Sequence, residues 1–109
     1  MIVKAWNNGS HRIDGNGYGI KILIHDRDRY FDSSWKTISV VLEGYNEPIY
    51  VNINKASFWN NTCHELIDKE IGKWLIEHHL DRWQYRRPPE LELIQIGERK
   101  FLLKVLNKS

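Results

Sequence analysis

The alternation of apolar and polar side chains predicts that much of this chain forms β-strands. Apolar residues occupy every second position in segments 18–25, 38–43 and 49–54. Successive side chains on a strand point to opposite faces, so each segment presents one strongly apolar face. Three such strands in succession favour an antiparallel meander with one face exposed to water.

Further strands are predicted at both ends of the chain. Residues 1–6 have the pattern of a short first strand, and segments 91–96 and 100–106 form a closing hairpin around a turn at 97–99. Between the second and third strands, residues 26–34 are polar and turn-prone. That segment is interpreted as a long loop or a bulged strand end.

One amphipathic helix is predicted over residues 62–79. Thr62 and Glu65 have the spacing of a capping box, in which each side chain binds a free backbone amide of the first turn. Leu66, Ile71 and Trp74 then recur on one side at helical spacing. The predicted fold class is α+β: a single domain, residues 1–109, with a largely antiparallel sheet of five or six strands that could curl toward a barrel, and this helix packed on it.

Length and composition agree with one folded domain and leave the partner open. The chain has 109 residues, of which 41% are hydrophobic and 28% charged, and its formal net charge is +2. This small basic excess permits a polyanionic partner without arguing for one. Cys63 is the sole cysteine, so no internal disulfide can form. Because the chain has no leader-like start and no apolar run of membrane-crossing length, we expect a cytoplasmic protein without a membrane partner.

Three catalytic motifs are present only in part. The glycines of segment 15–19 are spaced GxGxG and precede a strand, which favours a hairpin turn over a dinucleotide site. His64 and Glu65 lack the second histidine that a zinc-protease helix requires. The E-x-K triplet at 98–100 lacks a suitably placed upstream acid. We therefore predict no catalytic residue, metal site or cofactor, and favour a non-enzyme over an enzyme.

Two charged segments that contain aromatic residues form the predicted recognition surface. In segment 82–87 arginines alternate with aromatic residues, a composition that can stack nucleobases and neutralise phosphates. Alternatively, these aromatic side chains tuck under the helix and the arginines are solvated. In segment 25–31 acids and arginines either pair locally or contact a ligand. The predicted binding residues are Asp26, Arg27, Asp28, Arg29, Tyr30, Trp35, Arg82, Trp83, Tyr85, Arg86 and Arg87.

Several short motifs together resemble a family of small uncharacterised bacterial proteins carried on accessory or mobile gene cassettes. The motifs are GYGIKI, DRDRYF with a following tryptophan, SFW, CHEL and IGKWL, and they extend over most of the chain. The family has no known activity. The resemblance therefore implies a bacterial, cytoplasmic accessory protein and assigns no functional residue.

The leading functional hypothesis is a non-enzymatic binding or interaction module whose partner is unknown, either a protein or a nucleic acid. It follows from the aromatic content and the incomplete catalytic motifs. A homodimer is also compatible with the sequence, because spare aromatic residues and an unpaired edge strand favour self-association.

Two alternatives remain open from the residues alone. One is a nucleic-acid-binding protein or a small metal-independent ribonuclease that uses His11 or His25 together with Arg27, Arg29 and Tyr30. The other is a small-ligand-binding protein whose pocket, between the helix and the sheet, is lined by Trp59, Trp74 and Tyr50.

Overall fold

A computed structural model describes residues 1–106, which form seven strands and three helices. Along the chain these elements are β1 (Ile2–Asn7), β2 (Tyr18–Lys21), α1 (Ile24–Tyr30), β3 (Thr37–Leu42), β4 (Ile49–Asn52), α2 (Ala56–Trp59), β5 (Glu65–Ile67), α3 (Lys69–Glu77), β6 (Glu90–Gly97) and β7 (Lys100–Val105). The six predicted strands occur, but the one predicted over residues 18–25 ends at Lys21, and Ile24 and His25 belong to α1 instead. One further strand and two further helices were not predicted.

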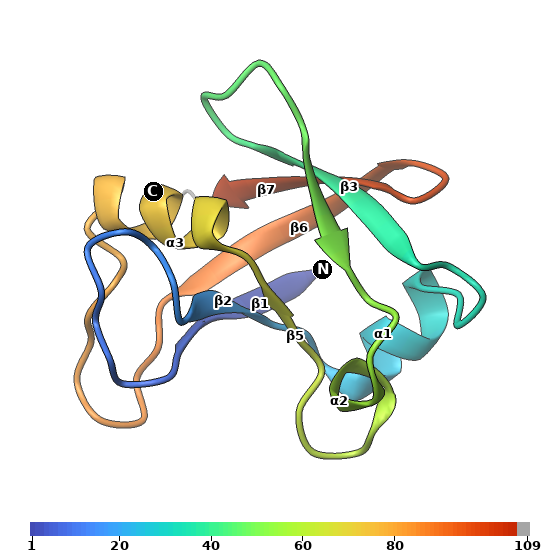
Figure 1. Cartoon of the computed structure of the whole chain (residues 1–109), viewed down its shortest axis with the longest axis horizontal. Helices are drawn as coiled ribbons and strands as arrows, with labels where there is room; N and C mark the ends of the chain where they lie inside the picture. The colour runs from blue at the N-terminus through green and yellow to red at the C-terminus, as the bar shows by residue number, and fades with distance from the viewer. Residues whose placement is uncertain (107–109) are drawn as a thin grey trace.

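The seven strands form one sheet in the order β4-β3-β7-β6-β1-β2-β5. The sheet curls until its two edge strands, β4 and β5, come into contact, which gives a nearly closed barrel (Figure 1). The α+β class is confirmed, but the expected five or six strands are seven and the sheet is mixed, because β3 and β7 run parallel. That pairing joins Ser39 to Lys100, and no local pattern in the sequence specifies a contact between positions so far apart.

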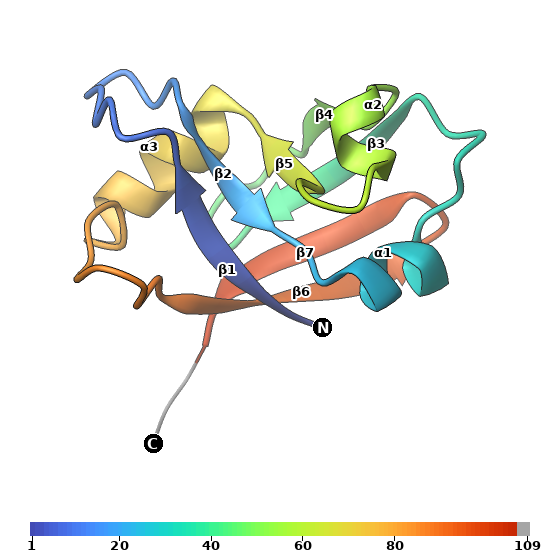
Figure 2. The same ribbon diagram turned by 90° about the horizontal axis from the view of Figure 1, so that it is seen from below.

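The apolar faces predicted from the alternation do form the core. Ile38, Val40 and Leu42 of β3 are buried, and so are Tyr18 and Ile20 of β2. The core is closed at one end by α3 and at the other by α1 and α2 (Figure 2). The hairpin predicted at the glycines is also confirmed, since β1 and β2 are antiparallel partners joined by the loop 8–17.

The helix predicted over residues 62–79 is in fact a strand followed by a shorter helix. Residues Glu65–Ile67 are β5, which pairs with β2, and the helix begins only at Lys69. Its N-cap is Asp68, whose carboxylate accepts a hydrogen bond from the backbone N–H of Glu70, so Thr62 and Glu65 do not form the predicted capping box. Gly19 permits the strand pairing, because a Cβ atom there would overlap the carbonyl oxygen of Leu66.

The segment predicted as a loop at residues 26–34 begins instead with a helix, α1. Arg27 is its buried residue, and Phe31, four positions later, is also buried, a spacing that a helix brings onto one face. Phe31, the C-cap, stacks on Phe101 with ring centroids 4.7 Å apart. The helix escaped prediction because its buried position is an arginine rather than an apolar residue.

Candidate functional site

The two segments predicted to form one recognition surface lie at opposite ends of the molecule. Helix α1 contains the acid and arginine run, whereas segment 82–87 belongs to the long connection between α3 and β6 (Figures 1 and 2). The structure therefore does not join them into the single surface that we expected. Each has to be considered separately.

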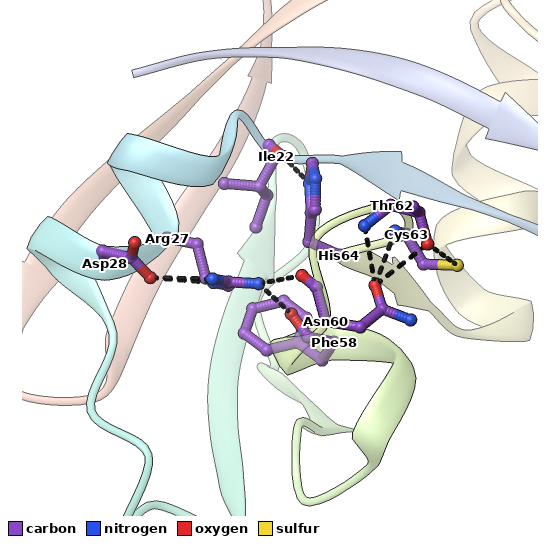
Figure 3. Close-up of polar contacts among 8 residues, drawn as sticks. All are labelled: Ile22, Arg27, Asp28, Phe58, Asn60, Thr62, Cys63 and His64. Atoms are coloured by element: carbon purple, nitrogen blue, oxygen red, sulfur yellow. Dashed lines mark hydrogen bonds and ion pairs between the residues drawn. The ribbon is translucent and has the colours of Figure 1, made fainter.

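Within the α1 segment, Arg27 is buried and engaged inside the protein. Its side chain is 5% exposed, and Nη1 donates hydrogen bonds to the carbonyl oxygens of Phe58 at 3.0 Å and Asn60 at 2.5 Å (Figure 3). Nε and Nη2 contact the carboxylate of Asp28 at 3.0 and 2.9 Å. Arg27 is predicted above as part of an exposed surface, and it instead fastens α1 to α2.

The other predicted residues near α1 line none of the cavities described below. Asp28 and Arg29 are exposed, Asp26 and Tyr30 are half-buried, and the guanidinium of Arg29 lies 5.3 Å from the centroid of the Tyr30 ring. Tyr30 and Trp35 pack against the core. The outer surface beside Arg27 is therefore formed by the charged residues Asp26, Asp28 and Arg29.

Segment 82–87 does line a cavity, of about 400 Å³, at the end of the molecule near α3. Its walls come from three parts of the chain, namely the end of β1, the loop 8–17 and the connection that follows α3. We call it the loop cavity, and it is lined by Asn7, His11, Arg82, Trp83, Tyr85 and Arg86.

The aromatic residues of the loop cavity are placed differently from one another. Trp83 is half-buried and packs against the core, whereas Tyr85 is 84% exposed. The guanidinium of Arg86 lies over the Tyr85 ring, 5.1 Å from its centroid. Trp83 therefore agrees with the structural interpretation of this segment, Tyr85 does not tuck under the helix, and recognition of a ligand stays a prediction. Arg87 is exposed beside the cavity and not part of its lining.

His11 is held in the cavity wall by the buried Tyr18. The Tyr18 hydroxyl lies 3.5 Å from Nδ1 of His11, and burial raises the pKa of this phenol, with a further increase from Asp81 and a decrease from Arg82. The phenol therefore keeps its proton, and its hydroxyl can either donate to Nδ1 or accept from it, according to the tautomer of the ring.

The charges around the loop cavity are mainly positive. Arg82 is 71% exposed at its side chain, and its Nε lies 3.9 Å from the Asp81 carboxylate, too far for a strong hydrogen bond. Arg86 has no ion pair among the described residues. Two guanidinium groups beside an exposed aromatic ring are suited to a ligand that combines phosphate with an aromatic base.

A second cavity involves a residue that sequence reasoning did not select as a binding residue. His64 lines it together with residues of β1, β2 and β6. Its placement depends on an unpredicted turn and on pairing with β2, and the sequence signal of a lone histidine after a cysteine does not reveal either. The small-ligand pocket predicted between the helix and the sheet was expected to be lined by Trp59, Trp74 and Tyr50. Trp74 is fully buried, Trp59 is half-buried and Tyr50 is exposed. Neither tryptophan lines the cavity beside His64 or the loop cavity.

Comparison of the chain with protein-family models, with curated proteins and with solved structures found no match. The resemblance to cassette-borne proteins thus stays a prediction.

Within residues 1–106, no group of three or more histidine, cysteine, aspartate or glutamate side chains could hold a metal ion. None of the helices in that range has the length and apolar character that a membrane crossing requires.

Proposed function

We propose that the protein is a binding module that holds single-stranded nucleic acid in the loop cavity. The observation that carries this proposal is the gathering of Arg82, Tyr85 and Arg86 with His11, which is about 70 positions away in the sequence, around one open cavity. It keeps the class of the leading hypothesis, a non-enzymatic binding module, and takes the partner from the nucleic-acid alternative.

The cavity suits one nucleotide with its flanking phosphates. A volume of about 400 Å³ lies at the small end of the range for ligand sites. An exposed aromatic ring such as Tyr85 stacks on a base with little regard to its identity, and arginines neutralise phosphate charge. His11 would add a ring nitrogen able to form a further hydrogen bond. The ligand must be single-stranded, because the bases of a duplex are already stacked on one another.

Binding is favoured over cleavage because the lining holds a single group suited to proton transfer near neutral pH. Cleavage of RNA without a metal needs a base to activate the ribose hydroxyl and an acid to protonate the leaving oxygen. His11 could fill one of these roles, and no second histidine or carboxylate lines the cavity.

The test is a titration of tryptophan fluorescence with single-stranded RNA, single-stranded DNA and duplex DNA of equal length, at two salt concentrations. Trp83 in the cavity wall provides the signal. We expect the single strands to bind at least about tenfold more tightly than the duplex, with affinity that falls as salt rises. Tyr85→Ala should weaken binding about 5- to 150-fold, the equivalent of about 1–3 kcal/mol for one lost stacking contact.

Arg86→Ala has a closely matched control in Arg29→Ala. Both arginines are exposed and lie over the ring of a neighbouring tyrosine, at 5.1 and 5.3 Å, but at opposite ends of the molecule. Arg86→Ala should reduce affinity and flatten the dependence of log K on log salt by about 0.7, whereas Arg29→Ala should change neither. Equal losses in the two variants, or no binding of any single strand at low salt, would refute the proposal.

A further inference from the structure

A second and larger cavity, of about 570 Å³, opens on the outer surface of the sheet at the start of β1. It lies over the paired strands β6, β1 and β2, and it also includes the residue just before β5. We call it the His64 cavity, and it is lined by Ile2, Lys4, Lys21, Ile22, Leu23, His64 and Glu90. The loop cavity shares none of these residues.

His64 is the one deeply buried polar side chain in this lining. It is 8% exposed, and its backbone has a φ of 61°, a left-handed conformation that non-glycine residues rarely adopt. Three contacts hold it there: its N–H donates to the Ser57 carbonyl, its carbonyl accepts from the N–H of Ile22, and its ring contacts the Ile22 carbonyl (Figure 3). The surrounding structure fixes this conformation in spite of its strain.

The ring contact decides which nitrogen faces the cavity. Because a carbonyl oxygen can only accept, the Nδ1 atom of His64 must carry a hydrogen and donate it to Ile22. Nε2 has no hydrogen bond within residues 1–106, and it is not among the buried atoms that lack a partner, so it is reached by solvent. The histidine in the cavity lining therefore has a solvent-accessible ring nitrogen, Nε2, that no described residue uses.

The charges beside His64 favour an anion. Lys4 is the cross-strand neighbour of both Lys21 and Glu90, so two ammonium groups and one carboxylate lie in a row across three strands. Their net charge is positive by one, and a hydrogen on Nε2 of His64 in addition to that on Nδ1 makes it positive by two. Lys21 reaches the Thr62 carbonyl with Nζ at 3.4 Å, and Lys4 has no ion pair among the described residues.

The remaining lining is aliphatic. Ile2 and Leu23 are among the most exposed large hydrophobic residues of the described chain, at 39% and 48%. An aliphatic chain lying between them would remove apolar surface from water on both sides, which favours binding. The cavity thus offers a cationic centre, an imidazole nitrogen and an apolar wall to one ligand.

We propose that the His64 cavity binds an aliphatic monocarboxylate. Its carboxylate lies between the ammonium of Lys4 and the protonated Nε2 of His64, and its hydrocarbon chain covers Ile2 and Leu23. With a hydrogen on both ring nitrogens, the imidazole donates to the Ile22 carbonyl through Nδ1 and to the ligand through Nε2. No covalent bond forms or breaks.

The proposal is tested near neutral pH by NMR titration of the labelled protein with hexanoate, following the amides of Ile22 and Leu23 and the ring signals of His64. Hexanol, which has the same chain without the charge, is the matched ligand control. We expect saturable shifts with hexanoate, a downfield shift of the His64 ring hydrogens, and at least about tenfold weaker binding of hexanol. Each methylene added to the carboxylate should raise affinity by up to about fourfold.

Two variants separate the contacts of the ligand from the stability of the fold. His64→Asn keeps a residue that tolerates positive φ and can still donate to the Ile22 carbonyl, but it has no Nε2. Lys4→Gln removes an exposed charge and leaves the buried contacts in place. Each should weaken hexanoate binding about tenfold or more, and Arg86→Ala should leave it unchanged.

Several results would overturn the assignment. They are equal binding of hexanol and hexanoate, hexanoate binding that Lys4→Gln does not weaken, and no saturable shift at all. Tighter binding of hexyl phosphate than of hexanoate would also refute it, because the site would then prefer a dianion. None of these results bears on nucleic-acid binding in the loop cavity, so the two proposals can fail independently.

Discussion

The two arginines of α1, Arg27 and Arg29, should differ strongly in their response to truncation, although the sequence presents them as equivalent. Arg27→Ala removes a buried guanidinium that serves two backbone carbonyls and a carboxylate, whereas Arg29→Ala removes an exposed one that only lies over Tyr30. We expect Arg27→Ala to be strongly destabilising and Arg29→Ala to be close to neutral.

The magnitude follows from the groups that Arg27→Ala leaves without partners. The Phe58 carbonyl lies in a buried contact, and losing its donor costs about 1–3 kcal/mol. The Asn60 carbonyl is only partly buried, so water can replace part of the lost bond, and we assign it about 1 kcal/mol. Asp28 is 60% exposed at its side chain, so no buried charge is left behind. The sum is about 3 kcal/mol, which lowers the melting temperature by roughly 12–24 °C in a domain of this size.

Arg29→Ala loses at most a surface cation–π contact, below about 1 kcal/mol. Urea unfolding followed by tryptophan fluorescence measures both variants, and an unchanged m-value would show that the same cooperative unit unfolds. Arg27→Lys should lie between the wild type and Arg27→Ala, because one ammonium keeps the charge but cannot reproduce the planar contacts. If the two alanine variants unfolded at the same urea concentration, the structural role of Arg27 would be refuted.

Three further predictions concern other parts of the fold. Gly72→Ala should lower the free energy of unfolding, measured in urea, by about 1–2 kcal/mol, because its Cβ would overlap the backbone of Gly15. The gain in helix propensity, about 1 kcal/mol, offsets only part of this strain. Unchanged stability would contradict the close approach of α3 to the Gly15 backbone. Hydrogen bonds from Arg12 and Asn16 hold the pKa of Asp14 well below its usual range. Asp14 therefore stabilises the fold at a pH above the ordinary carboxyl pKa of about 3.9, and this contribution is lost as the pH falls. The melting temperature of Asp14→Asn should fall less steeply on acidification than that of the wild type, and identical slopes would exclude the role. Burial lowers the pKa of Lys55, so mass spectrometry should show its acetylation rate levelling off at a lower pH than that of the exposed lysines, and a common pH dependence would refute this.

The strands could be predicted because their signal is local. In β3, every second side chain is apolar and every one of those is buried, so the pattern and the packing carry the same information. The order of the strands could not be predicted in this way. The parallel pairing of β3 with β7 depends on where the β6–β7 hairpin folds back, and no short segment of the sequence encodes that.

The helices show how a strong local signal can mislead. Residues 62–79 match a capped amphipathic helix, yet Leu66 is buried as the strand partner of Ile20. What decides the matter is Gly19, which lets the backbone of β5 approach β2, and this is visible only once both strands are placed. Helix α1 shows the opposite error, because a real helix was missed for lack of a local signal. Its inward residue is Arg27, and the hydrogen bonds that make a buried arginine acceptable go to α2, far away in the sequence.

The candidate sites were predictable to very different extents. The composition of segment 82–87 identified residues that line the loop cavity, because alternation of arginine and aromatic residues is itself the chemical signal. The contribution of His11 needed the fold, which brings the loop 8–17 beside that segment. His64 could not be found from composition, because its significance lies in burial, in a positive φ and in the Ile22 carbonyl that orients its ring.

Strand β1 connects the two cavities and also keeps them apart. Asn7 at its end lines the loop cavity, and Ile2 at its start lines the His64 cavity, five residue steps or roughly 17 Å away. β1 pairs with β2 on one side and β6 on the other, so it is held as a rigid element of the sheet. Substitutions this far apart that share no contacts act additively. A substitution in one cavity that abolished binding in both would therefore indicate loss of the β1 pairing, and not a role of that residue in both sites.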